Sequence, residues 1–405
     1  MTVASLDPSN LAAPVSASAR RAVPGWVCAW LWTVAGLVIL MVMVGGATRL
    51  TGSGLSITQW RPIAGALPPL SVADWTAEFA RYQASSQYRL LNAGMSLADF
   101  KSIYWWEWGH RQLGRFIGFV YGGVFLLGLA MRALPWRVGL RLALMGLLLG
   151  FQGLIGWIMV ASGLEAGMTA VEPLDLAAHL LLASLFLATL VAMATSLRRQ
   201  NSPGPAGAPS LAPTSAPTSA PTWAPTWAPP WAPWLSRLLL GSILLQLVFG
   251  ALVAGSHAGL VYNSWPTMDG RFLPPLGELF ASSPWWTNIF ENVTLIQLDH
   301  RLIAYAVLAL ALWNAAIWSR RGHDRGLARL AVALAFLVLA QVGLGIVTLL
   351  FAVPLAAALA HQLLAMLVLA VAVRLVVRSG RPALPPPSAA LPAAGSPLAA
   401  HVATR

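Results

Sequence analysis

The chain has 405 residues, of which 58% are hydrophobic and only 9% are charged, and its formal net charge is +12. This composition exceeds what a soluble core needs and is typical of a polytopic membrane protein. The basic residues lie mostly in short clusters between apolar runs, which argues against nucleic-acid binding. The single cysteine, Cys28, excludes an intrachain disulfide and a cysteine-based metal cluster.

Eight apolar runs are long enough to cross a bilayer. They lie near residues 26–44, 113–131, 139–160, 176–197, 236–255, 299–318, 328–350 and 354–376. Residues 1–25 are small, polar and proline-containing, so we expect a disordered cytoplasmic arm, followed by a first span that is retained rather than cleaved. Ala-Pro repeats predict a Pro-rich cytoplasmic linker at 200–234, and residues 379–405 predict a disordered tail.

Arginine clusters predict the orientation of these spans. If eight spans alternate, the clusters all fall on one side, which the positive-inside rule assigns to the cytoplasm. The clusters are Arg20-Arg21, Arg132 to Arg141, Arg198 to Arg237, Arg320 to Arg329 and Arg374 to Arg381. Both termini are then cytoplasmic. The outer side holds two long loops, about 48–109 and 256–298, where a binding surface can be built.

The first long loop contains two signals for helix starts. Ser71 with Asp74 opens a segment with helically spaced apolar residues, which predicts a short helix in the interface plane. Ser96 with Asp99 repeats the signal and predicts a second short helix. This helix leads into a tryptophan-rich loop, and we expect the next apolar helix to begin near Leu113. The aromatic residues predict an anchoring belt at the outer surface.

The four spans before the linker resemble the four after it. Matched positions are Gly54-Leu55 and Gly259-Leu260, Trp60 and Trp265, Pro68-Pro69 and Pro274-Pro275, and Gln152 to Gly156 and Gln341 to Gly345. Because four is an even number of crossings, both copies enter the membrane from the same side, which predicts a pseudo-two-fold axis along the membrane normal. The predicted fold is an all-α membrane protein whose eight transmembrane helices form two pseudo-two-fold-related four-helix bundles, residues 26–199 and 235–378.

Four histidines occupy matched places in the two halves. His110 and His300 stand at the heads of apolar runs, and His179 and His361 lie within other apolar runs. A single histidine at such a border can simply reach the headgroups, but two pairs at similar depth favour axial ligation of a haem iron in each bundle. Zinc fits less well, because no third or fourth ligand is evident in the second half.

The arginines next to two of these histidines have two interpretations. Arg111 and Arg301 can pair with haem propionates, since arginine offers a bidentate fork to carboxylates, or they can anchor the chain at the interface. The remaining histidines are not predicted ligands. His257 has no repeat partner, His323 lies in a basic cytoplasmic turn, and His401 lies in the tail.

One carboxylate distinguishes the halves. Glu107 precedes His110 by three residues, whereas Gln297 takes that place before His300. A titratable group is therefore present on the ligand face of only one copy, and the chemistry is expected there. The structural alternative for Glu107 is a salt bridge to Arg111 or Arg115.

Further motifs extend this pattern over all eight spans and both long loops. They are Gly45 to Ser56, Glu107 to Arg111, Gly156-Trp157, Met159-Val160, Ser162 to Leu164, Tyr262-Asn263, Trp265-Pro266, Met268 to Gly270, Glu291-Asn292, His300-Arg301 and His361-Gln362. In these motifs the sequence resembles the haem A synthase family, which oxidises haem O to haem A for cytochrome oxidase. Some members carry a cysteine pair in the first outer loop. Its absence here resembles the proteobacterial and mitochondrial branch.

The resemblance implies a division of labour between the bundles. It implies that His110 and His179 face the substrate, haem O, and that His300 and His361 ligate a permanent haem b. It implies oxidation of the C8 methyl of haem O to a formyl group in a bacterial inner membrane, with the haem sites near the outer face. Haem O synthase, cytochrome oxidase assembly factors and an electron donor or acceptor are the implied partners. Glu107 would accept a proton or stabilise positive charge at the methyl carbon.

Two other functions fit parts of the pattern. A two-haem carrier of electrons from quinol would use the same histidine pairs, and only the Glu107 and Gln297 difference and the family motifs argue against it. A transporter built from parallel repeats would need a polar pathway to the membrane midplane. The polar residues instead gather on the outer side.

Overall fold

The computed structural model describes residues 23–201, 229, 231–320 and 324–380. Within these ranges, eight helices are long and apolar enough to cross a membrane. They are α1 (Gly25–Leu50), α4 (Leu97–Ala130), α5 (Trp136–Gly163), α6 (Pro173–Asn201), α7 (Ala232–Gly255), α10 (Val293–Trp318), α11 (Arg325–Leu350) and α12 (Leu355–Ser379). The predicted all-α membrane fold with eight spans is therefore confirmed.

Several sequence predictions concern segments that lie wholly or mainly outside the described residues. The predicted arm at 1–25 is described only from residue 23, the Pro-rich linker at 200–234 only at its two ends, and the tail at 379–405 only as far as Gly380. His323 and His401 also lie outside the described residues. These expectations stay predictions.

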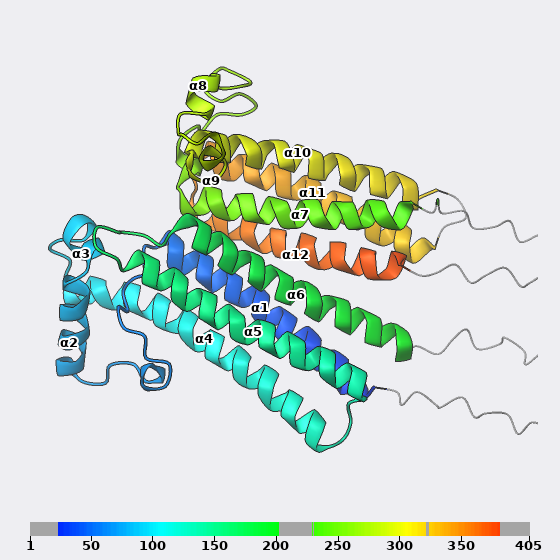
Figure 1. Ribbon diagram of the computed structural model, residues 1–405, viewed down its shortest axis with the longest axis horizontal. Coiled ribbons are helices and arrows are strands. Elements are labelled where there is room, and N and C mark those ends of the chain that lie inside the picture. Colours follow the sequence, from blue (N-terminus) through cyan, green and yellow to red (C-terminus); the bar gives the residue numbers. More distant parts are fainter. Residues whose placement is uncertain (1–22, 202–228, 230, 321–323, 381–405) are drawn as a thin grey trace, which may run out of the picture.

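The long helices lie side by side in two groups (Figure 1). One group contains α1, α4, α5 and α6, the other contains α7, α10, α11 and α12, and the groups meet through α1, α6, α7 and α12. The short helices α2, α3, α8 and α9 all lie at one end of the molecule, which we call the loop end (Figure 1). This arrangement agrees with the predicted pair of bundles, while the pseudo-two-fold axis stays a prediction.

Two of the long helices begin earlier than the sequence predicted. The expected loop before Leu113 does not form, because α4 runs without a break from Leu97 through the tryptophan-rich segment. Ser96 does cap the helix start, with Asp99 completing the capping box. Helix α4 contains no proline, and helix formation is cooperative, so the helix continues into the span. Similarly, α10 begins at Val293 rather than near residue 299, and the Asn292 side chain caps it.

The loop end is folded around the extended start of α4. Helix α2 (Val72–Gln83) begins after Ser71 with the predicted capping box. Its Trp75 and Tyr82 are buried against Phe100 and Tyr104 of α4. The predicted position of α2 in the interface plane stays a prediction. The short helices α3 (Ser86–Leu91), α8 (Leu276–Leu279) and α9 (Asn288–Glu291) were not predicted from the sequence.

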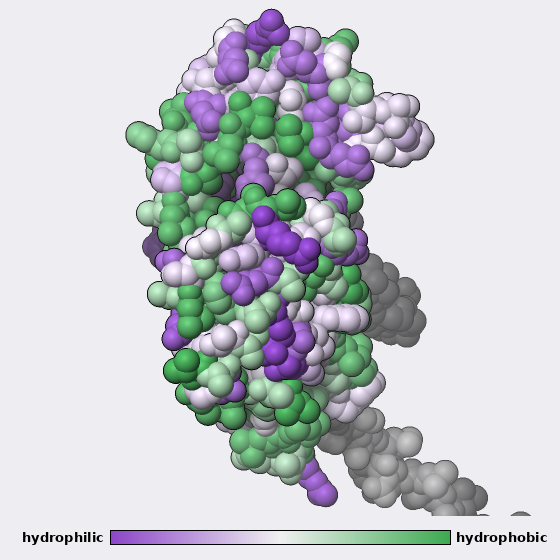
Figure 2. All heavy atoms as spheres, turned by 90° about the vertical axis from the view of Figure 1, so that its left-hand side faces the viewer, coloured by the Kyte–Doolittle hydropathy of each residue, from purple (hydrophilic) through white to green (hydrophobic). Residues whose placement is uncertain are grey.

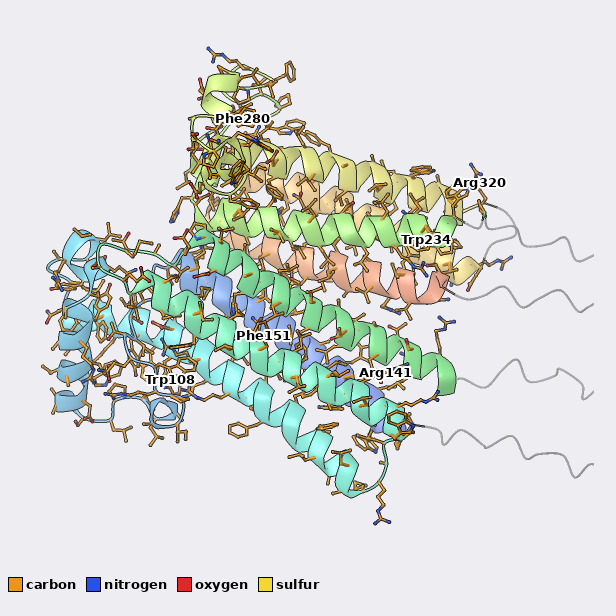
Figure 3. The ribbon with its side chains drawn as sticks, viewed as in Figure 1. Trp108, Arg141, Phe151, Trp234, Phe280 and Arg320 are labelled. Atoms are coloured by element: carbon orange, nitrogen blue, oxygen red, sulfur yellow. The ribbon has the colours of Figure 1, made fainter. Side chains whose placement is uncertain are left out.

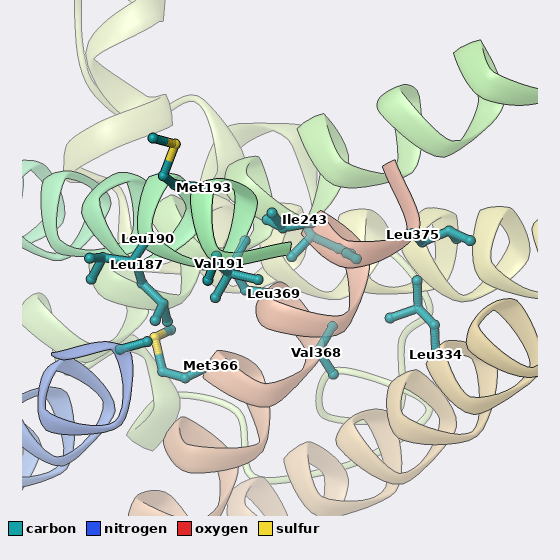
Figure 4. Close-up of a cluster of buried hydrophobic side chains, with 14 of the residues drawn as sticks. Leu187, Leu190, Val191, Met193, Ile243, Leu334, Met366, Val368, Leu369 and Leu375 are labelled. Atoms are coloured by element: carbon teal, nitrogen blue, oxygen red, sulfur yellow. The ribbon is translucent and has the colours of Figure 1, made fainter. Parts of the chain in front are cut away.

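The main apolar core runs through both groups of helices and across the boundary between them. Leu187 and Leu190 of α6 pack near Met366 and Leu369 of α12, and Ile243 of α7 joins the same cluster (Figure 4). This packing fixes the two groups against each other along most of their length. Lipid tails are as apolar as these side chains, so moving a side chain from lipid to a neighbouring helix gives little hydrophobic stabilisation. The close fit of side chains between helices holds them together instead.

The two ends of the molecule differ in character. Arg141 and Arg320 lie at the end opposite the loop end, whereas Trp108 and Phe280 lie toward the loop end (Figure 3). Seen from the loop end, hydrophilic residues gather in patches among apolar ones (Figure 2). Arg141 and Arg320, which come from two of the predicted arginine clusters, thus share one end, as the proposed orientation requires. The orientation itself stays a prediction.

Candidate functional site

The four matched histidines lie in the half of the helices nearest the loop end, and each faces a glycine of a neighbouring helix. A Cβ atom added at these glycines would lie between 2.7 and 3.3 Å from the nearest imidazole atom. The pairs are Gly45 with His110, Gly156 with His179, Gly250 with His300, and Gly345 with His361. Glycine is needed at these positions because the imidazole occupies the space of a side chain. Each ring therefore packs into the groove that the glycine leaves on the surface of the adjacent helix.

The histidines form two pairs across two helices. His110 on α4 and His179 on α6 are close enough for their imidazoles to interact electrostatically, and so are His300 on α10 and His361 on α12. Each half of the protein therefore brings together two histidines from different helices, as the sequence predicted.

Three of the four histidines are also held by a glutamine from the adjacent helix. The pairs are Gln152 with His179, Gln246 with His300, and Gln341 with His361. In each pair the amide Nε2 donates to the backbone oxygen of the histidine, over 3.1, 3.0 and 3.0 Å respectively. The same amide nitrogen lies within 3.0 to 3.2 Å of a ring nitrogen. These glutamines fix both the backbone and the ring of the histidines they contact.

This arrangement fits haem ligation. A histidine that binds iron through Nε2 carries its proton on Nδ1 and needs an acceptor there. The Oε1 atoms of Gln152, Gln246 and Gln341 are buried without a hydrogen-bond partner among the described residues. Nδ1 of His361 is likewise buried without one. Each of these amides therefore has an unused acceptor oxygen, while the amide atom beside the ring is the nitrogen.

Glu107 is the most heavily bonded side chain of the site. It is buried on α4, and one carboxylate oxygen, Oε2, accepts from the Ser56 hydroxyl at 2.8 Å and from the Ile57 backbone N–H at 2.7 Å. The other, Oε1, accepts from Nη2 of Arg111 at 2.6 Å and from its Nε at 3.1 Å. The salt bridge expected as the structural alternative is therefore present. The carboxylate ties the loop after α1 to the helix that carries His110.

Arg111 completes this attachment. Its guanidinium also donates to the backbone oxygens of Ile57 at 2.9 Å and Gln59 at 3.3 Å. Arg111 lines two cavities, of about 440 and 210 Å³, which residues of this loop also line. Neither cavity is lined by His110 or His179. The predicted pairing of Arg111 with a propionate stays a prediction, and protein groups already use most of its donors.

The second half repeats this attachment with an amide in place of the carboxylate. Nε2 of Gln297 donates to the backbone oxygens of Ala258 at 2.9 Å and Tyr262 at 3.2 Å. Arg301 donates to the same loop, at Tyr262, Ser264 and Thr267. Ile57 and Tyr262 are equivalent in the alignment that pairs Gly54 with Gly259. An uncharged side chain is therefore sufficient to hold the loop in this fold.

One hydrogen bond joins the halves near the histidines, and one charge acts from the first half on a histidine of the second. Gln362, next to His361, donates through Nε2 to the backbone oxygen of Val42 on α1 at 3.0 Å. The Arg49 guanidinium has no hydrogen bond or ion pair within the described residues and lies near His257. Burial, reinforced by the Arg49 charge, lowers the pKa of His257, so this histidine is neutral at pH 7. His257 belongs to neither histidine pair, and the expectation that it is not a ligand stays a prediction.

Fold and site together define a class of protein: a multi-pass membrane protein in which each four-helix half presents two histidines suited to a haem iron. Comparison with known families identifies it further. Residues 28–373 match the COX15-CtaA family, described as a cytochrome oxidase assembly protein, and the chain belongs to this family.

Curated relatives agree with this assignment. A protein of Methylobacterium sp. (strain 4-46) named "Heme A synthase" is 52% identical over 378 residues, which cover 92% of this chain and 97% of the relative. A protein of the same name from Azorhizobium caulinodans is 48% identical over 357 residues, covering 88% and 94%. One from a Bradyrhizobium species is 47% identical over 344 residues, covering 85% and 88%.

The sequence pattern pointed to the histidines, the arginines and Glu107, but not to the groups that hold them. Ser56 and the three glutamines were not singled out as site residues. A signal for the glutamines was present, because a glutamine stands four residues before the cradling glycine in Gln152 to Gly156, in Gln246 to Gly250, and in Gln341 to Gly345. Two of these segments were recognised only as part of the internal repeat.

Proposed function

We propose that this protein is the enzyme that converts haem O to haem A for cytochrome oxidase, an oxidoreductase acting on the C8 methyl group of its substrate. Its family membership sets the reaction. The observation that carries the proposal is that two histidine pairs share one fold, but only His110 has a carboxylate, Glu107, three residues before it, whereas Gln297 takes that place before His300. A plain electron carrier would have no need for this difference.

The substrate is assigned to the first half and a resident haem b to the second. His110 and His179 would face the iron of haem O, and His300 and His361 would ligate haem b, which supplies one-electron transfer when bound. The packing of the helices supports this division. Helices α4 and α5 touch each other much less, and are less buried, than their counterparts α10 and α11. A substrate that must enter and leave needs such an opening, whereas a permanent group is better enclosed.

Glu107 provides negative charge on the face of α4 that carries His110. We assign it to stabilising the positive charge that develops at the methyl carbon during oxidation. Its carboxylate is held in place by Ser56, Ile57 and Arg111, so it requires little reorganisation during the reaction. The competing role is to anchor the loop. In the second half an amide fills that role, which makes Glu107→Gln the variant that separates the two.

One contact between the halves involves residues next to a histidine of each pair. Gln362 follows His361 and binds α1 at Val42, and Gly45 of the same helix lies against His110. Electrons that pass between the two irons would cross this contact. The route is consistent with a second haem that serves the first.

We also propose an orientation for the protein. Both termini are cytoplasmic, the loop end faces outward, and the membrane is the bacterial cytoplasmic (inner) membrane. The shared end of Arg141 and Arg320 supports this topology. Haem O synthase, cytochrome oxidase assembly factors and an electron donor or acceptor are the proposed partners.

The test is to express the chain with a supply of haem O, purify it in detergent and separate the extracted haems. The comparison is between wild type, Glu107→Gln and Glu107→Ala. We expect haem A from wild type, and haem O or a hydroxylated intermediate from Glu107→Gln with haem b retained. Glu107→Ala should in addition loosen the loop, seen as faster proteolysis within residues 52–70.

Two outcomes would overturn parts of this proposal. If wild type carries haem b and forms no haem A, the protein is a two-haem electron carrier. If Glu107→Gln forms haem A at the wild-type rate, Glu107 is an anchor for the loop and has no part in the chemistry.

A further inference from the structure

The four histidine positions are not equivalent. Three have a glutamine four residues before the glycine that cradles the ring. At the fourth position the cradling glycine is Gly45, and four residues before it stands Met41. The alignment that pairs Gly54 with Gly259 also pairs Met41 with Gln246, so methionine here takes the place of the glutamine that holds His300.

Met41 cannot do what the glutamine does. A thioether has no N–H to donate to the histidine backbone, and its sulfur is only a weak acceptor for a ring N–H. The Met41 side chain instead packs with the apolar core and reaches Gly114 on α4, one turn past His110. No side chain among the described residues hydrogen-bonds to the His110 ring.

The ring of His110 is also turned differently in its groove. A Cβ at Gly45 would lie nearest to Nε2 of His110, at 3.1 Å. At the other three glycines the nearest ring atom is Cε1. Nε2 is the atom that binds haem iron. At His110 this atom faces α1, and no glutamine in the described part of the chain hydrogen-bonds to it. Both observations single out the same histidine.

We infer that His110 is the exchangeable axial ligand of the substrate iron, and that Met41, by replacing the orienting glutamine, is what makes it exchangeable. His179, held by Gln152, stays on the iron. When the bond between iron and Nε2 of His110 opens, the electron pair stays on the nitrogen, and one axial position becomes free for an external ligand. This inference rests on the proposed function, because it takes the iron in the first half to be that of the substrate.

The expected effect on ligand exchange follows from the groups that hydrogen-bond to metal ligands and orient them. Removing the group that orients a ligand typically weakens the site by roughly 10- to 100-fold. The two halves should therefore differ by a factor of this size in how readily an external ligand displaces a histidine. Carbon monoxide is a suitable probe, since it binds reduced haem iron only where an axial position opens and shifts its Soret band.

The experiment titrates the reduced, two-haem protein with carbon monoxide. In wild type, one haem should bind the gas at concentrations where the other stays inert. Met41→Gln should weaken that binding by roughly 10- to 100-fold. Met41→Leu, which adds no hydrogen-bonding group, should behave like wild type. Gln246→Met should make the second haem reactive as well. Gln246→Met still tests the inference if Met41→Gln does not fold.

Three results would overturn the inference. These are an unchanged titration of a folded Met41→Gln, an inert second haem in Gln246→Met, and equal reactivity of both haems in wild type. Haem A formation is measured in the same preparations. If wild type makes haem A but Met41→Gln binds carbon monoxide normally, the ligand assignment fails and the proposed function stands. If the titrations agree with expectation but no haem A forms, the ligand assignment stands and the proposed function fails.

Discussion

The glycine cradles allow a graded prediction in the second half of the protein. A methyl group at Gly345 would lie 2.9 Å from Cε1 of His361, which is 0.5 Å short of the 3.4 Å at which ordinary contact begins. At Gly250 the distance to Cε1 of His300 is 3.3 Å, a shortfall of only 0.1 Å. At Gly343, on the same helix as Gly345, no atom lies within 4 Å. Alanine at the three sites should therefore perturb the haem to very different degrees.

The expected size of the perturbation depends on how far a metal–ligand distance can change before the bond is strained. Ligand distances in metal sites hold to about 0.2 Å, so a ring pushed by 0.5 Å cannot keep its bond unstrained. Overpacking of this kind costs about 1 to 3 kcal/mol, or roughly 5- to 150-fold in the ligation equilibrium. Gly345→Ala should lose His361 as a ligand, Gly250→Ala should show a small effect, and Gly343→Ala should behave like wild type.

The assay is electron paramagnetic resonance and optical spectroscopy of the purified, oxidised protein. Two axial histidines give a low-spin iron, and loss of one gives a high-spin signal whose amount can be counted against total haem. A Gly345→Ala protein that keeps a fully low-spin haem b, bound as tightly as in Gly343→Ala, would refute the reasoning. It would mean either that His361 does not ligate or that α11 moves to make room.

Three further predictions concern groups around the site. Asn314 is buried and accepts a hydrogen bond from the Ser236 hydroxyl. Asn314→Ala should lower stability by about 1 to 3 kcal/mol, measured by thermal unfolding, with haem content unchanged. Gly46→Ala, which would force Gln362 off α1, should slow electron transfer between the haems, and normal flash-induced transfer would exclude the proposed route. Arg301→Lys should speed proteolysis of the loop at 256–292 even in haem-free protein, whereas a residue that served only a propionate would leave haem-free protein unchanged.

The sequence by itself determined where the chain crosses the membrane and which residues are candidates for chemistry. Long apolar runs must become helices in lipid, because no water is there to satisfy the backbone. Polar side chains are costly at such places, so His110, His179, His300 and His361 stood out without any structure. The Glu107 and Gln297 difference was likewise visible, because it depends only on spacing from a histidine.

Tertiary structure decided which side chains meet. The loop expected before Leu113 was mispredicted because a capping signal tells where a helix begins, while its length depends on the residues beyond the cap and on packing at the loop end. Two of the four bonds of Glu107 come from Ser56 and Ile57, which lie about fifty residues away in the chain and whose position depends on how the loop folds back. The glutamine partners depend on the rotation of each helix about its axis against its neighbour. Hydropathy leaves that rotation open, because side-chain packing between helices sets it.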